Sequence, residues 1–535
     1  MRKLMAILLA ALLVAPATAL AATSIEELQK KIEELTDEVD YLSGRVDKTE
    51  KHTALDRIEF TGDLRVKADT LHYKDVTNVQ PPFMDTDGDG FLNFNMVDPT
   101  TFKRESKDLD NDILYTTRLR LNMKAKVYDN VNFAGRLAMY KNWGDSTGTK
   151  VFDSWSSFTM DGSDGGNTTG DWLRVERAYF DWNSIGGSNF YLSIGRRPST
   201  YGPPGQYREN ELRGGTPSGH LVNFNFDGIT IGYNLSEVTG IEGQVVRFCY
   251  GQGYESEYGN GELFNQIDLD DTHLGGFNID ALNDGTNFLQ VTAFMAKDVT
   301  DGFKGVFAVP TAFLPPSLAS QMMPGVNLNA RLQARENIGD IILGGIGFAR
   351  EEMNGVNWFG SLGWTRMDPN GKANMFGGMI SDPEMAFMAA DGSISMTPTG
   401  SDVAMVPTGN ALTSDTEDGY GFYAGVQVPA PLGKFGLEYN YGSEFWTPFT
   451  QAQDDVMGSK LATRGHAGEA YYIFDINPNM FIKVGGIYYD YEYTGSGSPV
   501  GKPQKVDDVI NGTAYSMLPV VDKAWDGYAS LTVKF

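Results

Sequence analysis

Cysteine is almost absent from this chain. Cys249 is the one cysteine among 535 residues, which excludes an intramolecular disulfide, a cysteine-rich zinc site and a CxxCH haem attachment. Histidine is nearly as scarce, and the histidines are scattered at His52, His72, His220, His273 and His466, so a histidine-based metal site is not supported. The sequence also contains no P-loop, GxSxG or HExxH motif. We therefore do not expect an enzyme.

Basic side chains are outnumbered, with 43 Lys and Arg against 69 Asp and Glu, for a formal charge of −26. This balance argues against nucleic-acid binding, because phosphate contacts need clustered Lys and Arg. The mean hydropathy of −0.29 is that of a soluble, acidic protein. A membrane-spanning β-barrel has a similar average, however, because only alternate residues of its strands face lipid. The 62 Gly, 25 Tyr and 31 Phe favour strands and turns.

Long apolar runs are limited to one, at residues 4–20. Arg2 and Lys3 precede it, and Ala19-Leu20-Ala21 closes it, which together are typical of a secretory signal peptide. We predict a signal peptide at 1–21, with a membrane-anchoring helix as the alternative. No cysteine follows the run, which argues against a lipoprotein anchor.

A heptad pattern follows the apolar run. Apolar residues are spaced three and four apart at Ile25, Leu28, Ile32, Leu35, Val39, Leu42 and Val46. Charged residues flank this stripe, which predicts a short coiled coil over 22–52. An amphipathic helix packed on its own protein would show similar spacing. The β-branched residues at a and Leu at d nominally favour two strands.

The last twelve residues alternate strictly. Trp525, Ala529, Leu531, Val533 and Phe535 fall on one face, and polar residues fall mostly on the other. This pattern, carried to a terminal Phe, resembles the closing strand of Gram-negative outer-membrane β-barrels, whose assembly machinery reads such a strand. The resemblance implies that Phe535 contacts the barrel assembly machinery.

Similar alternation recurs from residue 57 to residue 535. It predicts an all-β fold, an antiparallel transmembrane β-barrel of sixteen strands, at about 57–71, 112–127, 131–143, 172–183, 189–197, 218–234, 243–254, 271–283, 287–298, 339–351, 356–367, 418–430, 434–446, 463–475, 478–493 and 524–535. Short, turn-rich connections alternate with long, polar ones, as in outer-membrane barrels. The phase of the pattern changes at Asp227-Gly228, which indicates a bulge or a hairpin, and a hairpin would raise the count to eighteen.

One segment resembles Gram-negative porins more closely than the rest. It runs from Trp172 to Trp182, turns, and continues from Phe190 to the Gly195-Arg196-Arg197 end. The following stretch, 198–217, is similar to the porin loop that folds into the channel and narrows it. The chain also resembles an uncharacterised porin-like family with an N-terminal coiled coil. This resemblance implies an outer-membrane diffusion channel for small hydrophilic solutes or ions, a homotrimer, and contact with outer-membrane lipid and lipopolysaccharide.

The alternation also indicates which charges line the pore. On the early strands these are Arg65, Lys67, Arg118, Arg120, Lys124, Lys126, Arg136, Arg174 and Arg197, and on the folded loop Glu209 and Glu211. A basic wall facing a partly acidic loop would orient solutes and give a mild anion preference. The alternative is that these charges pair with one another and set no selectivity.

An acidic loop offers one candidate metal site. Asp85, Asp87, Asp89 and Asn93, with Gly90 between them, match the start of a calcium loop. Met96 stands where such a loop carries its bidentate Glu, so an acidic, solvated external loop is the alternative. We expect no other cofactor.

Two further functions remain open. The barrel could be a sheath for a partner such as an electron-transfer cytochrome, or the chain could be a secreted or surface β-protein used for adhesion. For the channel, we expect the barrel in the outer membrane and the coiled coil in the periplasm.

Overall fold

The computed structural model describes most of the chain after residue 57 and part of the N-terminal helix. The described residues are 30–32, 35–42, 58–79, 104–144, 150–151, 173–215, 218–225, 227–255, 269–301, 305–309, 328–332, 334, 336–374, 377–389, 394–395, 402–450, 454–511, 514, 516 and 520–535. Residues 1–59 and 60–535 form two separate compact units.

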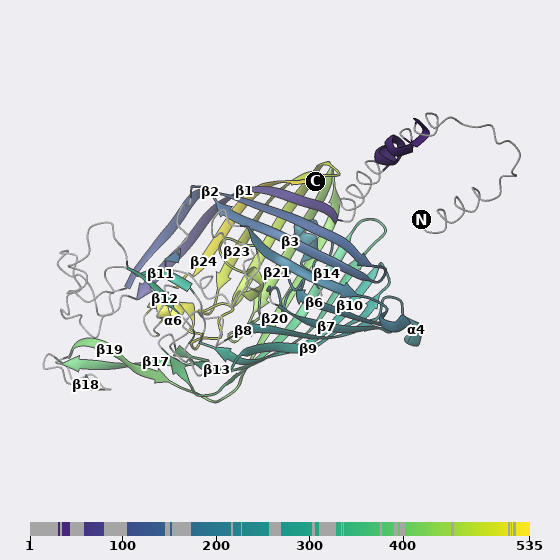
Figure 1. Cartoon of the computed structure of the whole chain (residues 1–535). Coiled ribbons are helices and arrows are strands. Elements are labelled where there is room, and N and C mark those ends of the chain that lie inside the picture. The colour runs from purple at the N-terminus through teal and green to yellow at the C-terminus, as the bar shows by residue number, and fades with distance from the viewer. Residues whose placement is uncertain are drawn as a thin grey trace, which may run out of the picture. The chain divides into compact units, whose positions relative to one another are not determined.

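The larger unit is a closed barrel of sixteen antiparallel strands (Figure 1). In order around the ring they are β1 (Ile58–Val79), β2 (Arg104–Tyr128), β3 (Val131–Asn142), β5 (Arg174–Trp182), β6 (Phe190–Arg196), β7 (Asp227–Asn234), β8 (Val245–Tyr254), β9 (Thr272–Asn283), β10 (Asn287–Thr300), β13 (Asn337–Glu351), β14 (Asn357–Pro369), β20 (Glu417–Ala430), β21 (Gly433–Gly442), β22 (Gly465–Asn477), β23 (Met480–Tyr491) and β24 (Lys523–Lys534). The predicted sixteen-stranded barrel is confirmed, and the alternative of eighteen strands is wrong.

The two-residue period of the sequence places the strand side chains. On β10, Leu289, Val291 and Met295 are 37–40% exposed, whereas Gln290 and Thr292 between them are 1% exposed. Successive side chains of a strand point to opposite faces of a sheet. The barrel therefore has an apolar outer face and a largely polar inner face.

The ring closes between β1 and β24. Gly62 and Phe535 exchange both backbone hydrogen bonds, at 2.7 and 2.9 Å, and the register runs from Asp63 opposite Lys534 to Lys74 opposite Lys523. A Cβ added at Gly62 would lie 2.6 Å from the Phe535 ring. The glycine thus allows the terminal aromatic ring to lie against β1.

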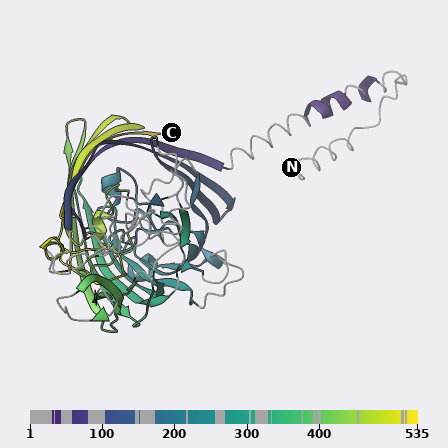
Figure 2. The same cartoon turned by 90° about the vertical axis from the view of Figure 1, so that its left-hand side faces the viewer.

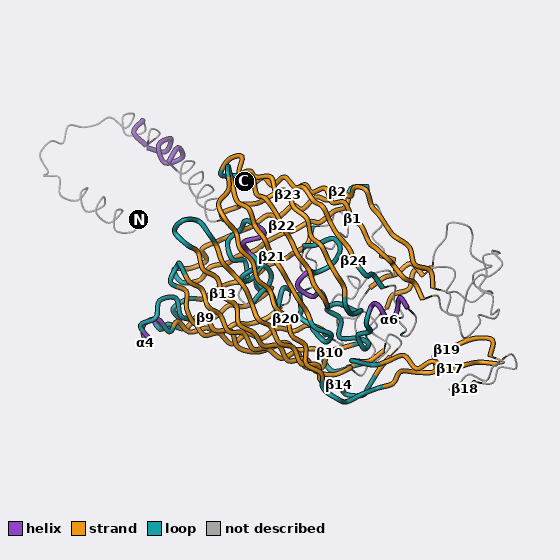
Figure 3. Tube along the Cα trace, turned by 180° about the vertical axis from the view of Figure 1, so that it is seen from behind, coloured by secondary structure: helices purple, strands orange, loops and turns teal. Residues whose placement is uncertain are grey.

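Connections alternate in length around the ring. The short ones, such as 129–130, 284–286 and 431–432, lie at the end of the barrel where β1 begins and β24 ends, and the long ones lie at the other end (Figures 1 and 3). Small sheets form within the long connections, from β4 (Lys150–Val151), β11 (Gly305–Val309) and β12 (Leu328–Leu332), from β15 (Ala373–Asn374) and β16 (Gly377–Gly378), and from β17 (Asp382–Ala389), β18 (Ile394–Ser395) and β19 (Asp402–Ala411).

The expected strand at 218–234 is wrong in its first half. β7 begins at Asp227, so Asp227-Gly228 is the start of a strand and forms neither a bulge nor a hairpin turn. Val222 and Phe224 precede it in a buried, non-strand segment. Their different phase arises because they belong to a loop.

The smaller unit is helical at 30–32 and 35–42. Within it the Thr36 hydroxyl donates to the Ile32 carbonyl at 2.7 Å. The heptad residues Ile32, Leu35, Val39 and Leu42 are 49–62% exposed. Across the part of the chain that is described, no helix is long and apolar enough to cross a membrane. The signal peptide at 1–21 lies outside the described residues, and the coiled coil over 22–52 stays a prediction.

Candidate functional site in the barrel lumen

The first inner loop, residues 197–215 and 218–225, follows β6 and runs inside the ring of strands (Figure 2). It contains the one-turn helix α3 (Gln206–Glu209). The two ends of the loop are connected by a hydrogen bond from the Tyr201 backbone amide to the Asn223 side-chain oxygen at 2.8 Å. Tyr207 donates to Glu351 on β13 at 2.9 Å, and Lys434 of β21 donates to Asn210 at 3.1 Å. The loop is thus braced against distant parts of the ring.

A second inner loop, residues 443–450 and 454–464, pairs with the first. The Asn223 amide donates to the Phe449 carbonyl at 2.6 Å, and the Phe449 amide donates to the Leu221 carbonyl at 2.9 Å. The Trp446 indole donates to the Leu461 carbonyl at 2.8 Å. The sequence had predicted an external, polar connection at 447–462. That prediction is wrong because this segment buries Phe449 and the charged side chains of Asp454, Asp455 and Lys460 inside the barrel.

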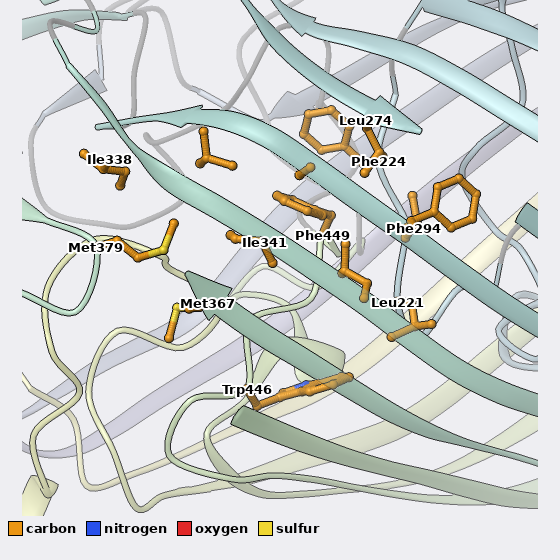
Figure 4. Close-up of a cluster of buried hydrophobic side chains, with 14 of the residues drawn as sticks. Leu221, Phe224, Leu274, Phe294, Ile338, Ile341, Met367, Met379, Trp446 and Phe449 are labelled. Atoms are coloured by element: carbon orange, nitrogen blue, oxygen red, sulfur yellow. The ribbon is translucent and has the colours of Figure 1, made fainter. Parts of the chain in front are cut away.

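The two inner loops share an apolar core with one side of the wall (Figure 4). Leu221, Phe224, Trp446 and Phe449 pack with Phe294, Ile338, Ile341, Leu343 and Met367 of β10, β13 and β14, all at most 4% exposed. Gly363 of β14 stands opposite Gly421 of β20. A Cβ added to either glycine would lie within 2.5 Å of the Trp446 ring. The paired glycines therefore make the space that Trp446 fills.

Basic side chains of β1 and β2, here called the basic wall, form ion pairs with acidic side chains of the inner loops. Arg118 of β2 lies 3.1 Å from Asp454, and Arg65 of β1 also pairs with Asp454. Arg120 forms an ion pair with Glu211. Asp63 of β1 completes the group, at 3.1 Å from Arg118 and 2.8 Å from Arg120.

Acidic side chains of β21 and β22, here called the acidic wall, form ion pairs with basic side chains of the inner loops. The Arg208 guanidinium of α3 lies 2.6 Å from Glu469 of β22. Lys460 of the second inner loop pairs with both Glu469 and Glu438 of β21. Asp455 links the two inner loops through its ion pair with Arg208. The inner loops therefore lie between two walls of opposite charge.

The loop carboxylates are strongly acidic in this setting. Burial raises the pKa of the Glu211 carboxyl, but the guanidinium groups of Arg120 and Arg118 outweigh burial and lower that pKa to about 2. Burial also opposes ionisation of Asp454, yet Arg65 and Arg118 hold its pKa well below the usual range. The carboxyl groups of Glu211 and Asp454 consequently stay ionised at physiological pH.

The predicted pore-lining residues differ in exposure and in their partners. Arg65, Lys67, Arg118 and Arg120 are buried, and Glu209 and Glu211 meet this wall, with Glu209 at 3.6 Å from Arg118. Arg136 lies 3.0 Å from Glu176. Lys124 and Lys126 are exposed, and Lys126 pairs with Asp129 at the short-turn end. Arg174 is partly exposed. Arg197 donates to Ser193 at 2.8 Å and to Thr230.

The candidate calcium ligands Asp85, Asp87, Asp89 and Asn93 lie outside the described residues. Within the described ranges, no group of three or more His, Cys, Asp or Glu side chains could hold a metal ion. The calcium loop therefore stays a prediction.

A family described as "Protein of unknown function (DUF3373)" matches residues 108–535. No curated protein sequence matches the chain. Several solved structures are similar: OmpT, an outer membrane protein of Vibrio cholerae, in its trimer form (12% identity, TM-score 0.39, 89% of this chain and 99% of that one); the anion-selective porin from Comamonas acidovorans (8%, 0.39, 89% and 99%); and Salmonella typhi OmpF in complex with daunomycin (10%, 0.39, 89% and 97%). At these TM-scores the similarity supports no argument about function.

Proposed function

Because the chain belongs to the DUF3373 family, whose function is unknown, we propose a function from the barrel itself: an outer-membrane porin for passive diffusion of small hydrophilic solutes or ions. The barrel's two faces carry the proposal. An apolar outer surface suits lipid, and a polar, charged lumen suits water and hydrophilic solutes. Side chains such as Leu289 and Gln290, adjacent on β10 and opposite in exposure, illustrate the difference.

The outer face carries further support for membrane insertion. Aromatic residues are exposed near both ends of the strands, with Trp182, Phe190, Trp358 and Phe435 towards the short turns and Tyr115, Trp143, Tyr250 and Tyr420 towards the long connections. Aromatic side chains at both edges of an apolar band are typical of outer-membrane barrels. We place the short turns and the N-terminal helix in the periplasm, and propose a homotrimer and contact with lipopolysaccharide on the outer surface.

The inner loops support a narrow channel rather than a wide pore. They occupy the lumen where a sheathed partner would otherwise sit, which favours the channel over the cytochrome sheath. Since Arg65, Arg118 and Arg120 are already paired with carboxylates, an anion preference would depend on other basic residues.

Purified protein in planar bilayers tests the proposal. We expect discrete conductance steps in KCl, and a reversal potential in a salt gradient that indicates weak anion preference. Heat-modifiable mobility in gels would show in the same preparation that the barrel is folded. A heat-modifiable protein that gives no conductance at any salt concentration would contradict the channel.

A further inference from the structure

We infer that the inner face of β6–β8, together with the end of the first inner loop, binds an anionic solute bearing a carboxylate or a similar oxyanion. The site consists of Arg197, Arg247 and Arg213. This inference rests on the proposed function, because it places a solute site inside the proposed channel.

The three arginines come from neighbouring elements. Arg247 of β8 donates from Nε to the Tyr191 hydroxyl of β6 at 2.8 Å. Arg197, directly after β6, donates back to Ser193 of β6 and to Thr230 of β7. Tyr191 and Ser193 are two residues apart on the same face of β6, so the two arginines bond to neighbouring side chains of the inner wall.

Arg213 approaches from the inner loop. Its Nη2 lies 3.8 Å from Asp280 of β9, and Arg247 lies 2.7 Å from the same carboxylate. The Arg213 guanidinium also lies 4.7 Å from the centre of the Phe288 ring. Asp280 is therefore shared between two arginines.

Positive charge exceeds negative charge at this site. Among the described residues, Arg213 and Arg247 form ion pairs only with Asp280, and Arg197 forms no ion pair. To the residues that the structure describes, the Arg197 side chain donates two hydrogen bonds, both to neutral hydroxyl groups, and the other N–H groups of its five are available to a ligand. The contrast is Arg118, which has four carboxylate neighbours within 4 Å.

The geometry indicates the class of ligand. A guanidinium presents parallel N–H groups that match two oxygens of one carboxylate or phosphate, which a halide ion cannot offer. The site remains open to solvent, since Arg213 keeps 33% of its side-chain surface exposed and Arg197 is partly exposed. Small carboxylates such as citrate therefore fit better than neutral sugars.

Arg196 provides a matched control. It is adjacent to Arg197 but points to the outer face, where it pairs with Asp227 across the strand at 3.3 Å. Replacing either arginine by glutamine removes one charge from the same strand end. Only the change at Arg197 should affect a solute in the lumen.

The experiment uses the full-length protein in planar bilayers, with citrate added on one side, and titration calorimetry of citrate into the detergent-solubilised protein. We expect reversible current block by citrate, weakened about tenfold or more in Arg197→Gln, partly restored in Arg197→Lys, and unchanged in Arg196→Gln. Equal block in Arg197→Gln and the natural protein, or equal loss in both glutamine variants, would overturn the site. Conductance without citrate binding would reject the site and keep the channel. Citrate binding without conductance would keep the site and reject the channel.

Discussion

Arg118 on β2 lies 3.1 Å from Asp454 on the second inner loop, although 336 residues separate them along the chain. Their side chains are 2% and 5% exposed. The pair connects the basic wall to a loop whose other side is held by the acidic wall. The inner loops are therefore fixed by charge on both flanks, with an apolar core between them.

Removing one partner of this pair should loosen the second inner loop. Asp454→Asn leaves Arg65 and Arg118 short of a buried counter-charge, and breaking a buried pair costs about 3–5 kcal/mol. We expect a lower thermal midpoint in detergent and a larger, noisier single-channel conductance.

Asp227→Asn is the control for that variant. Asp227 is 59% exposed and pairs with Arg196 on the outer face, where a salt bridge contributes about 0–1 kcal/mol. Both its thermal midpoint and its conductance should match those of the natural protein. Identical behaviour of the two variants would mean that the Asp454 contacts do not hold the loop.

Trp446→Ala should loosen the same assembly through packing. The Trp446 ring is fully buried over Gly363 and Gly421, and truncating a buried Trp costs about 3–5 kcal/mol. We expect a lower thermal midpoint and increased conductance. Trp358→Ala, on a side chain that is 50% exposed, should leave the conductance unchanged, and an equal increase in that variant would contradict the role assigned to Trp446.

The strands were predictable because each carries its own evidence in a two-residue period. All sixteen were found from the sequence, and the error at 218–234 joined a loop to the strand that follows it. Period-2 alternation reports which side chains share a face, and it is independent of distant contacts.

The second inner loop was not predictable in the same way. Whether a long connection folds inward depends on space that remote strands provide, such as that between Gly363 and Gly421, and cross-strand register is not visible in one sequence. Phe445-Trp446 had been assigned to the end of the strand predicted over 434–446, but that strand ends at Gly442 and the two aromatic residues belong to the inner loop. The pairing of Arg118 with Asp454 likewise became visible only when Asp454 was placed in three dimensions.

The stability of the inner loops should depend on pH through His220. This side chain is fully buried beside Trp446, with ring centroids 4.9 Å apart, and burial lowers its pKa from 6.5 to about 3. The unfolded chain therefore binds a proton below about pH 6.5 that the folded protein does not, so stability falls as pH decreases from there, by roughly 1.4 kcal/mol per unit.

The His220→Leu variant isolates this effect between pH 6.5 and about 4.5. The Glu211 carboxyl, whose pKa falls from 4.5 to about 2, loses its contribution only below that interval. We expect the thermal midpoint of the natural protein to fall between pH 6.5 and 4.5, and that of His220→Leu to change less. Parallel curves for the two proteins would exclude His220 as the cause.

The exposed stripe of the N-terminal helix should associate with the same stripe of another copy. Leu35 is 60% exposed and occupies a d position of the heptads, so in a coiled coil it faces its equivalent in a neighbouring chain. Leu35→Cys should form an intermolecular disulfide under oxidising conditions, measured as a crosslinked species in non-reducing gels. The native Cys249 is buried and adds little background. Asp37→Cys places the thiol on the outer flank of the same helix and should not crosslink, and equal crosslinking of both variants would show that the helices meet without the predicted heptad register.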